Sequence, residues 1–301
     1  MATERWSLRS YLQQRSELIE TALNDYLPVV ESSPSRLHEA MRYSVFAGGK
    51  RLRPILLLAA CEAVGGDAAK ALPAACSLEM VHCYSLVHDD LPAMDDDDLR
   101  RGQPTNHRVF GEATAILAGD ALLTEAFALL SSATTCAKIA PAPCCEVVQI
   151  LARSIGSTGM VGGQVVDMES EERAIDLATL EFIHTRKTSA LIRAAVEMGA
   201  VIGEATDEQR QALCRYAEAA GLAFQVADDI LDIVADQAEL GKSIGSDQDR
   251  GKATFPSLIG LGQARRRAAE LKQQALTEIA ALDDSARALR EIATYIVDRS
   301  N

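Results

Sequence analysis

The hydrophobic residues of this 301-residue chain recur with the period of a helix, and no segment alternates apolar and polar positions as a strand does. Alanine and leucine are frequent, whereas aromatic residues, which favour strands, make up only 4%. Beyond residue 66 the pattern predicts helices over 68–90, 112–132, 143–156, 177–202, 207–236, 256–281 and 285–298. We therefore expect an all-α fold with ten or more helices.

Proline and glycine mark the ends of the earlier helices. Ser33-Pro34 is typical of an N-cap followed by proline at the first helical position, and Gly48-Gly49 ends that helix. Pro54 begins another helix, which Gly65-Gly66 ends. The predicted loops, none with the composition of an interdomain linker, cover 92–111, 133–142, 168–176 and 237–254. Residues 1–301 are therefore expected to form a single domain.

The composition is that of a soluble globular protein, with 48% hydrophobic and 24% charged residues. The formal net charge of −13 argues against a general nucleic-acid binder, because phosphate backbones select for Lys and Arg. The longest apolar run, Pro54 to Cys61, is far shorter than the ~20 residues of a membrane span. Seven cysteines without a CxxC spacing indicate reduced thiols, and the N-terminus lacks an apolar secretory segment, so we expect a cytoplasmic protein.

An aspartate-rich segment, DDLPAMDDDD, runs from Asp89 to Asp98 and follows a mainly apolar helical stretch. Pro92 removes an amide hydrogen and clashes with the preceding turn, so the helix should end or bend here. The chain can then curl back and bring Asp95 beside Asp89. Acidic runs are usually solvated surface, but the position at the end of a core-like helix favours a metal site.

A second cluster, DDILD, holds Asp228, Asp229 and Asp232. Residues four apart share a helix face, so Asp228 and Asp232 lie side by side on an otherwise apolar helix. Two such carboxylates repel each other, and a hard cation such as Mg²⁺ relieves the repulsion while leaving positions for phosphate. The two clusters together predict facing metal sites in a cavity.

Basic residues recur beside glycine or aspartate. GGKRLRP supplies Lys50, Arg51 and Arg53, and further basic residues are Arg100, Arg101, Lys187, Lys242 and Lys252. Together with magnesium carboxylate sites, guanidinium and ammonium groups imply a diphosphate or triphosphate substrate. Neither the GxxxxGK[ST] loop of P-loop nucleotide-binding proteins nor the GxSxG signature of serine hydrolases is present.

These segments, in their order along the chain, resemble those of the trans-polyprenyl diphosphate synthases. The similar segments include GGKRLRP, DDLPAMD followed by DDDLRRG, PTNHRVFGEATAILAGDALL, GMVGGQVVD, HTRKTSALI, GLAFQVADDILD and GKSIGSDQDRGKATFP. The resemblance covers about residues 35–300 and is nearest to bacterial farnesyl diphosphate synthases, with geranylgeranyl diphosphate synthases close behind. It implies an isoprenoid synthase fold around a deep central cavity, a homodimer, several Mg²⁺ ions, and condensation of isopentenyl diphosphate with dimethylallyl or geranyl diphosphate.

The resemblance also implies residue roles. Mg²⁺ would be held by Asp89, Asp90 and Asp95 from one wall and by Asp228, Asp229 and Asp232 from the other. The allylic diphosphate would be held by Arg100, Lys187, Lys242 and Lys252, and isopentenyl diphosphate by Lys50, Arg53, His82 and Arg101. Thr188 and Gln225 would offer oxygen dipoles to the allylic cation, and bound diphosphate, rather than a side chain, would take the final proton.

Product length should depend on the helix before Asp89. Tyr84 and Ser85 lie about one turn deeper, and in the resembling family an aromatic residue here limits the product to about fifteen carbons. Tyr84 thus favours farnesyl diphosphate. The alternatives are a twenty-carbon synthase, a cyclase or head-to-head enzyme on the same fold, and a non-catalytic regulatory subunit. GGKRLRP argues against a cyclase, because it serves a second diphosphate, and both aspartate clusters argue against the subunit.

Overall fold

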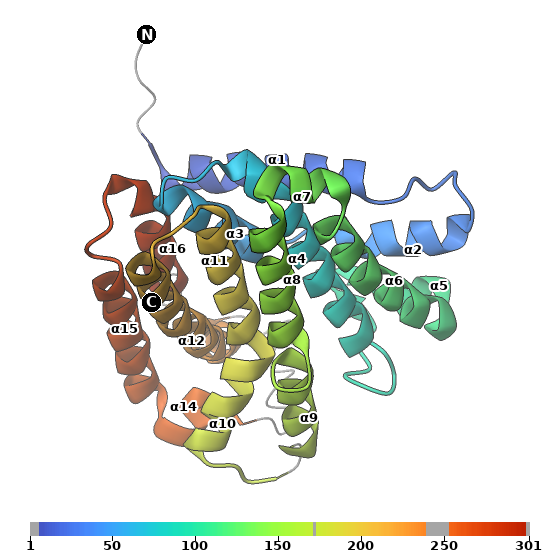
Figure 1. Cartoon of the computed structure of the whole chain (residues 1–301). Helices are drawn as coiled ribbons and strands as arrows, with labels where there is room; N and C mark the ends of the chain where they lie inside the picture. The colour runs from blue at the N-terminus through green and yellow to red at the C-terminus, as the bar shows by residue number, and fades with distance from the viewer. Residues whose placement is uncertain (1–5, 171–172, 239–252, 299–301) are drawn as a thin grey trace. The chain divides into compact units, whose positions relative to one another are not determined.

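The computed structural model describes residues 6–170, 173–238 and 253–298, and these are helical apart from loops and one two-stranded sheet (Figure 1). The expected all-α class is confirmed. The chain divides into two compact units, one of residues 1–58 and 67–148 and the other of 59–66 and 149–301. The expected single domain stays a prediction, and each unit is described by itself.

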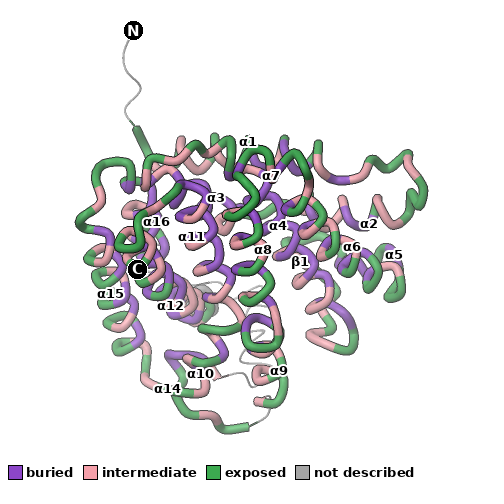
Figure 2. Tube along the Cα trace, viewed as in Figure 1, coloured by how far each residue is buried: buried purple, intermediate pink, exposed green. Residues whose placement is uncertain are grey.

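The first unit is built around the helix that precedes the first aspartate cluster. Its elements are α1 (Leu8–Tyr26), α2 (Ser35–Val45), the first half of α3 (Leu52–Ala63), α4 (Ala68–Asp89), β1 (Leu99–Arg100), β2 (Gln103–Pro104), α5 (Asn106–Phe110), α6 (Glu112–Leu130), α7 (Ala133–Ile139) and the start of α8 (Pro141–Ile155). The Asp67 side chain caps α4 by accepting from the Ala69 amide at 2.9 Å. Buried residues run along α4 from Ala71 to Val87 (Figure 2).

The most extensive helix–helix contact in the first unit is between α4 and α6. Gly119 on α6 lies against the His88 ring, because a Cβ there would be 2.2 Å from His88 Nε2. The same nitrogen lies 3.0 Å from Ile116 O. His88 therefore packs between the helices.

The second unit is organised by its longest helix. Its elements are the ends of α3 and α8, then α9 (Met160–Ser170), α10 (Leu177–His184), η1 (Thr185–Ser189), α11 (Ala190–Ile202), α12 (Asp207–Ala238), α14 (Phe255–Ile259), α15 (Leu261–Glu278), η2 (Asp284–Ala286) and α16 (Arg287–Asp298). A capping box begins α12, since Thr206 Oγ1 accepts from the Gln209 amide and Gln209 Oε1 from the Thr206 amide. Tyr216 on α12 is fully buried and donates to Leu289 O on α16 at 2.7 Å.

Several helix boundaries differ from the predicted ones. Pro34 is the N-cap of α2 rather than its first helical residue, and the Ser33–Pro34 peptide is cis. The predicted helix 256–281 is broken at Gly260, whose φ of +80° places it in the left-handed region. The predicted helix 177–202 contains five residues of π-helix, η1, between α10 and α11.

Candidate active site

The first aspartate-rich segment begins where α4 ends, at Asp89. Beyond it the chain curls tightly, with the Met94 amide donating to Leu91 O at 2.8 Å. The amide of Asp95 donates to Asp89 O, also at 2.8 Å, which closes the curl. The prediction that the helix ends near Pro92 and that Asp95 returns to Asp89 is therefore confirmed.

Asp90 is turned into the protein, with only 3% of its surface exposed. Arg100 on β1 binds Asp90 Oδ1 through Nε and Nη2, both at 2.6 Å, and Nη2 also lies 3.3 Å from Asp97 Oδ2. Burial raises the pKa of the Asp90 carboxyl, although the Arg100 guanidinium opposes the rise. Asp90 and Arg100 thus bind each other here, and their roles toward a metal ion and a diphosphate stay predictions.

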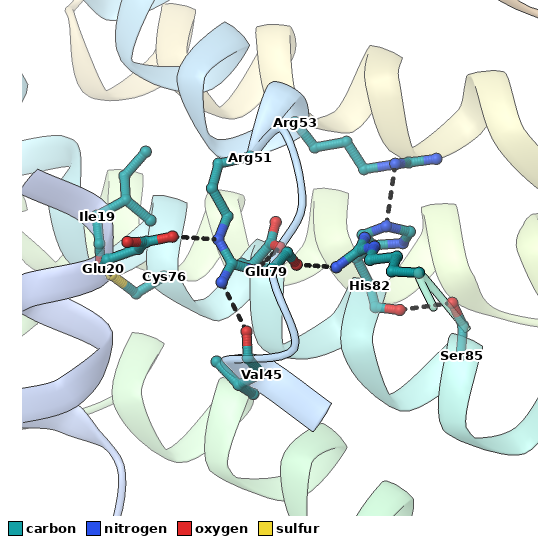
Figure 3. Close-up of polar contacts among 11 residues, drawn as sticks. Ile19, Glu20, Val45, Arg51, Arg53, Cys76, Glu79, His82 and Ser85 are labelled. Carbon is teal, nitrogen blue, oxygen red and sulfur yellow. Dashed lines mark hydrogen bonds and ion pairs between the residues drawn. The ribbon is translucent and has the colours of Figure 1, made fainter. Parts of the chain in front are cut away.

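The loop between α2 and α3 is anchored by Arg51, which is 2% exposed (Figure 3). Its Nη1 donates to Glu79 Oε1 on α4 at 2.7 Å, and Nη2 donates to Val45 O at 2.6 Å. Its Nε lies 3.4 Å from Glu20 Oε1 on α1. A guanidinium with these partners fixes the loop to three helices of the first unit, so Arg51 acts on the protein itself rather than on a ligand.

Arg53 and His82 lie beyond this anchor, with Arg53 Nη1 3.3 Å from His82 Nε2 (Figure 3). A guanidinium only donates, so Nε2 accepts and the ring proton sits on Nδ1. Burial, and after it the charges of Arg53 and three other arginines, lower the pKa of His82 well below its ordinary 6.5. His82 is therefore neutral at pH 7 and orients Arg53. Two residues predicted to hold isopentenyl diphosphate thus come together.

Arg101, a third member of that set, reaches the same loop. Its Nη1 donates to Gly48 O, and a Cβ on Gly49 would lie 2.5 Å from this nitrogen. Glycine at 49 therefore lets the guanidinium lie on the loop backbone. Lys50, the fourth member, follows directly in the chain and is exposed. The first unit thus gathers all four residues around one loop.

A cavity of about 310 Å³ in the second unit collects most of the other predicted residues. We call it the aspartate cavity. From α12 and η1 it is lined by Gln225, Asp228, Asp229, Asp232, Lys187 and Thr188, and from neighbouring segments by Asp167, His184 and Thr254. The prediction that Asp228 and Asp232 share a face is confirmed. Lys242 and Lys252 lie outside the described residues.

Asp229 is more deeply buried than Asp228 and Asp232, with only 6% of its surface exposed. The Phe255 amide, at the start of α14, donates to Asp229 Oδ2 at 2.8 Å. His184 Nε2 lies 3.5 Å from the same oxygen, and the His184 ring stacks on that of Phe255 at 5.6 Å between centroids. Asp229 thus fastens α14 to α12, and its predicted metal role stays a prediction.

Gln225 is oriented by His184. Gln225 Nε2 lies 3.1 Å from His184 Nδ1, and an amide nitrogen can only donate, so Nδ1 accepts. His184 then carries its proton on Nε2, facing Asp229. Because Gln225 Nε2 is engaged in this way, Gln225 Oε1 is the atom left to face the cavity.

Lys187 is held by a residue that the sequence did not single out. Its Nζ donates to Asp167 Oδ2 on α9 at 2.6 Å. A Cβ on Gly163 would lie 2.5 Å from the Lys187 amide nitrogen, so glycine lets α9 approach η1 closely. Asp167 belongs to the recognised segment GMVGGQVVD, but nothing in the sequence pairs it with Lys187. Nothing in the sequence pairs His184 with Gln225 either.

The donor set of the aspartate cavity fits Mg²⁺. Within the described residues, no three His, Cys, Asp or Glu side chains are gathered as a closed metal site. Mg²⁺ usually keeps several waters and binds through one or two carboxylates together with substrate phosphates. Asp228 and Asp232, one turn apart on one face, supply such oxygens. The first cluster belongs to the other unit, so the facing arrangement of the two clusters stays a prediction.

Comparison with known proteins gives the family. A sequence profile of the polyprenyl synthetase family matches residues 34–293. The chain is 48% identical to a heterodimeric geranylgeranyl pyrophosphate synthase large subunit 1, chloroplastic, from Arabidopsis thaliana, over 97% of this chain and 79% of that protein. It is 45% identical to a farnesyl diphosphate synthase from Geobacillus stearothermophilus, over 98% of this chain and 99% of that protein.

The fold is shared as well. The crystal structure of an FPP/GFPP synthase from Zymomonas mobilis superposes with a TM-score of 0.86 at 41% identity, over 96% of this chain and 98% of that one. The chain therefore belongs to the polyprenyl synthetase family. It has the all-α isoprenoid synthase fold, and it is a trans-prenyltransferase.

Proposed function

We propose that this prenyltransferase condenses isopentenyl diphosphate head-to-tail with dimethylallyl and geranyl diphosphate and stops at farnesyl diphosphate. The observation that carries the proposal is Tyr84, which is 7% exposed and lies on α4 five positions before Asp89. Burial, and then the charge of Asp89, raise the pKa of Tyr84 to about 12, so the phenol lies near that carboxylate. In this proposal the aromatic ring of Tyr84, about one helical turn before the first aspartate cluster, limits the length of the growing prenyl chain.

Ser85, the other predicted chain-length residue, supports the same proposal less directly. Its Oγ donates to His82 O at 2.8 Å, which ties the small side chain back to its own helix. Tyr84 is the bulkier of the two, and its ring meets that of His88 edge to face at 5.8 Å. Tyr84 is therefore the residue whose size should set the depth of the pocket.

The residues of the chain have distinct tasks in the proposed reaction. Lys187, fixed by Asp167, and Arg100, fixed by Asp90, would donate hydrogen bonds to the leaving diphosphate from positions that need no reorganisation during the reaction. When bound, Mg²⁺ supplies further positive charge at the phosphate oxygens, and the carboxylates of the two clusters would hold it.

The allylic carbon becomes cationic as diphosphate leaves, and the chain must stabilise it while excluding water. Gln225 Oε1, aimed by His184, and the Thr188 hydroxyl offer oxygen dipoles to that carbon. Arg53, held by neutral His82, and Arg101, held on the glycine loop, would bind the second diphosphate. The buried apolar length of α4 suits a pocket that must keep water from the cation.

A direct assay tests the proposal. The purified protein is incubated with Mg²⁺, isopentenyl diphosphate and, in turn, dimethylallyl, geranyl or farnesyl diphosphate, and the products are separated by chain length. We expect fifteen carbons from the first two substrates and little extension of the third. Efficient extension of farnesyl diphosphate would establish the alternative, a geranylgeranyl diphosphate synthase. No turnover with any of them would indicate the regulatory subunit.

Helix α6 exposes large apolar side chains that a partner subunit could cover. Among the described residues it alone is long and apolar enough to span a membrane. Ile116 and Leu117 on it are 44% and 58% exposed. We propose that a second copy of the chain covers this face, as the resemblance to homodimeric synthases implies. The molar mass from light scattering tests it, and Leu117→Glu should shift a dimer toward monomer.

The proposed location is the cytoplasm. All seven cysteines are free, and four of them are buried, Cys61, Cys76, Cys83 and Cys144. Thiols kept in this way are typical of a reducing compartment. Fractionation of the source cells with an antibody to the protein tests this location.

A further inference from the structure

A second cavity, of about 570 Å³, lies in the second unit on the other side of η1 from the aspartate cavity. Four arginines from four elements line it, and we call it the arginine cavity. They are Arg153 on α8, Arg186 on η1, Arg193 on α11 and Arg267 on α15. None of the residues placed in the prenyl-transfer site lines this cavity.

Two of the four guanidiniums are neutralised by carboxylates. Arg193 Nε lies 3.0 Å from Glu218 Oε1, and Arg193 Nη1 lies 3.5 Å from Glu197 Oε2. Arg267 Nη2 lies 3.2 Å from Glu181 Oε1. Because these pairs cancel charge locally, Arg193 and Arg267 are not by themselves evidence for a bound anion.

The other two guanidiniums keep their charge. Arg186 Nη1 donates to a backbone oxygen, Thr158 O, at 2.8 Å, and its guanidinium lies 5.6 Å from the centre of the Phe182 ring. Arg153 has no carboxylate partner within the part of the chain that the structure describes. The cavity therefore presents two positive charges without a carboxylate partner, one from α8 and one from η1.

The rest of the lining selects the kind of anion. Short polar groups, Ser154 and Thr158, alternate with an apolar surface formed by Ala190, Ala219, Leu222 and Leu271. An apolar surface strengthens the field of nearby charges. Guanidinium forks match the oxygens of phosphate better than a single point charge does. We propose that the arginine cavity binds a phosphate-type dianion, inorganic phosphate or diphosphate, between Arg153 and Arg186.

The position of η1 connects this anion site with the aspartate cavity. Thr185, Arg186 and Ser189 face the arginine cavity, whereas Lys187 and Thr188 face the aspartate cavity. The five residues thus form a wall shared by both cavities. An anion on Arg186 fixes the outer side of this wall and restricts the turn that carries Lys187. The site is therefore a regulatory one, which senses phosphate or diphosphate and acts on the geometry of Lys187.

Calorimetric titration without substrate and without Mg²⁺ tests the proposal. With EDTA present and ionic strength held constant with chloride, inorganic phosphate and diphosphate are titrated separately, which identifies the preferred ligand. We expect saturable binding that falls at least tenfold in Arg153→Gln/Arg186→Gln. The matched control is Arg265→Gln/Arg266→Gln, which removes two exposed arginines of α15 that do not line the cavity and should leave binding unchanged.

Two further variants locate the bound anion. Asp228→Asn relieves negative charge in the aspartate cavity, so an anion bound there would bind more tightly, whereas one in the arginine cavity is unaffected. Hydrogen exchange over residues 182–193 should slow on addition of the anion in the unsubstituted protein but not in Arg153→Gln/Arg186→Gln. Absence of binding, or binding that survives the double substitution, would overturn the proposal. Because no prenyl substrate is present, this result is independent of the product assay.

Discussion

The Arg51 guanidinium and the Glu79 carboxylate meet at 2.7 Å inside the first unit, each side chain no more than 2% exposed. Burial lowers the pKa of Arg51, but the charge of Glu79 and the hydrogen bond to it together raise it above the ordinary value. Arg51 therefore stays charged. It holds in place the loop that carries Lys50 and leads to Arg53, so a contact without a ligand determines how two predicted ligand-binding residues are presented.

Breaking this pair from one side should destabilise the protein. We expect Glu79→Gln to cost about 3 kcal/mol of unfolding free energy, because the buried Arg51 charge then keeps only the more distant and half-exposed Glu20 as its carboxylate partner. Replacing both residues with methionine should cost much less in stability but still raise KM for isopentenyl diphosphate. Urea denaturation and steady-state kinetics measure the two effects. Glu39→Gln, at an exposed position on α2, is the control, and a loss no greater than in this control would contradict the assignment.

His82 should make stability depend on pH. Its pKa is lowered in the folded protein, so below pH 6.5 the unfolded chain binds a proton that the folded chain does not. Unfolding free energy should therefore fall as the pH drops through 6.5, by up to about 1.36 kcal/mol per pH unit from this residue. His82→Gln should flatten the slope by that one proton. Unfolding free energies of the two proteins between about pH 5 and 8 test this, and parallel curves would refute it.

Substitution of Asp228 should mainly affect catalysis, whereas substitution of the adjacent Asp229 should mainly affect stability. Asp228 lines the aspartate cavity, so Asp228→Asn should lower kcat by roughly 10²-fold or more, as loss of a preorganised electrostatic contact does. Asp229→Asn weakens the acceptor of the Phe255 amide and should cost about 1–3 kcal/mol of unfolding free energy. Kinetics and thermal unfolding of both variants separate the roles. The reverse pattern would show that Asp229 is the principal ligand.

Shortening Tyr84 should lengthen the product. Tyr84→Ala removes the ring that is proposed to limit the pocket, so products of twenty carbons or more should accumulate, whereas Tyr84→Phe should keep the fifteen-carbon product. Chromatography of the dephosphorylated products measures the ratio. Ser85→Ala is the neighbouring control for a general disturbance of α4. If Tyr84→Ala retains the product length of the unsubstituted protein, the pocket is limited elsewhere.

Local geometry made part of the site predictable from sequence. The helical period places Asp228 and Asp232 on one face, and Pro92 forces the turn that returns Asp95 to Asp89. Both depend on residues a few positions apart, whose relation the backbone fixes. Most helix positions beyond residue 66 were predictable for the same reason, although α7 lies in the predicted loop 133–142.

Contacts between distant segments were not predictable in this way. Arg100 binds Asp90, and Asp229 accepts from the amide of Phe255. These pairings depend on how helices pack, which no local pattern encodes. The π-helical turn η1 was missed because TRKTS contains neither glycine nor proline and fits an α-helix equally well. Helices α1 and α9 were missed because their polar residues interrupt the apolar period.

The length of η1 has a consequence for how this chain can vary. A π turn holds one residue more than an α turn, and each residue of an α-helix rotates the chain by about 100°. The π turn absorbs its extra residue, so deleting one residue from Thr185–Ser189 would restore an ordinary helix and keep α10 and α11 in nearly the same relative rotation. The deletion would instead change the spacing of Lys187 and Thr188, which line the aspartate cavity. A one-residue deletion in this segment would therefore spare the fold and alter the site, whereas the same deletion within α10 or α11 would rotate the helix by about 100°.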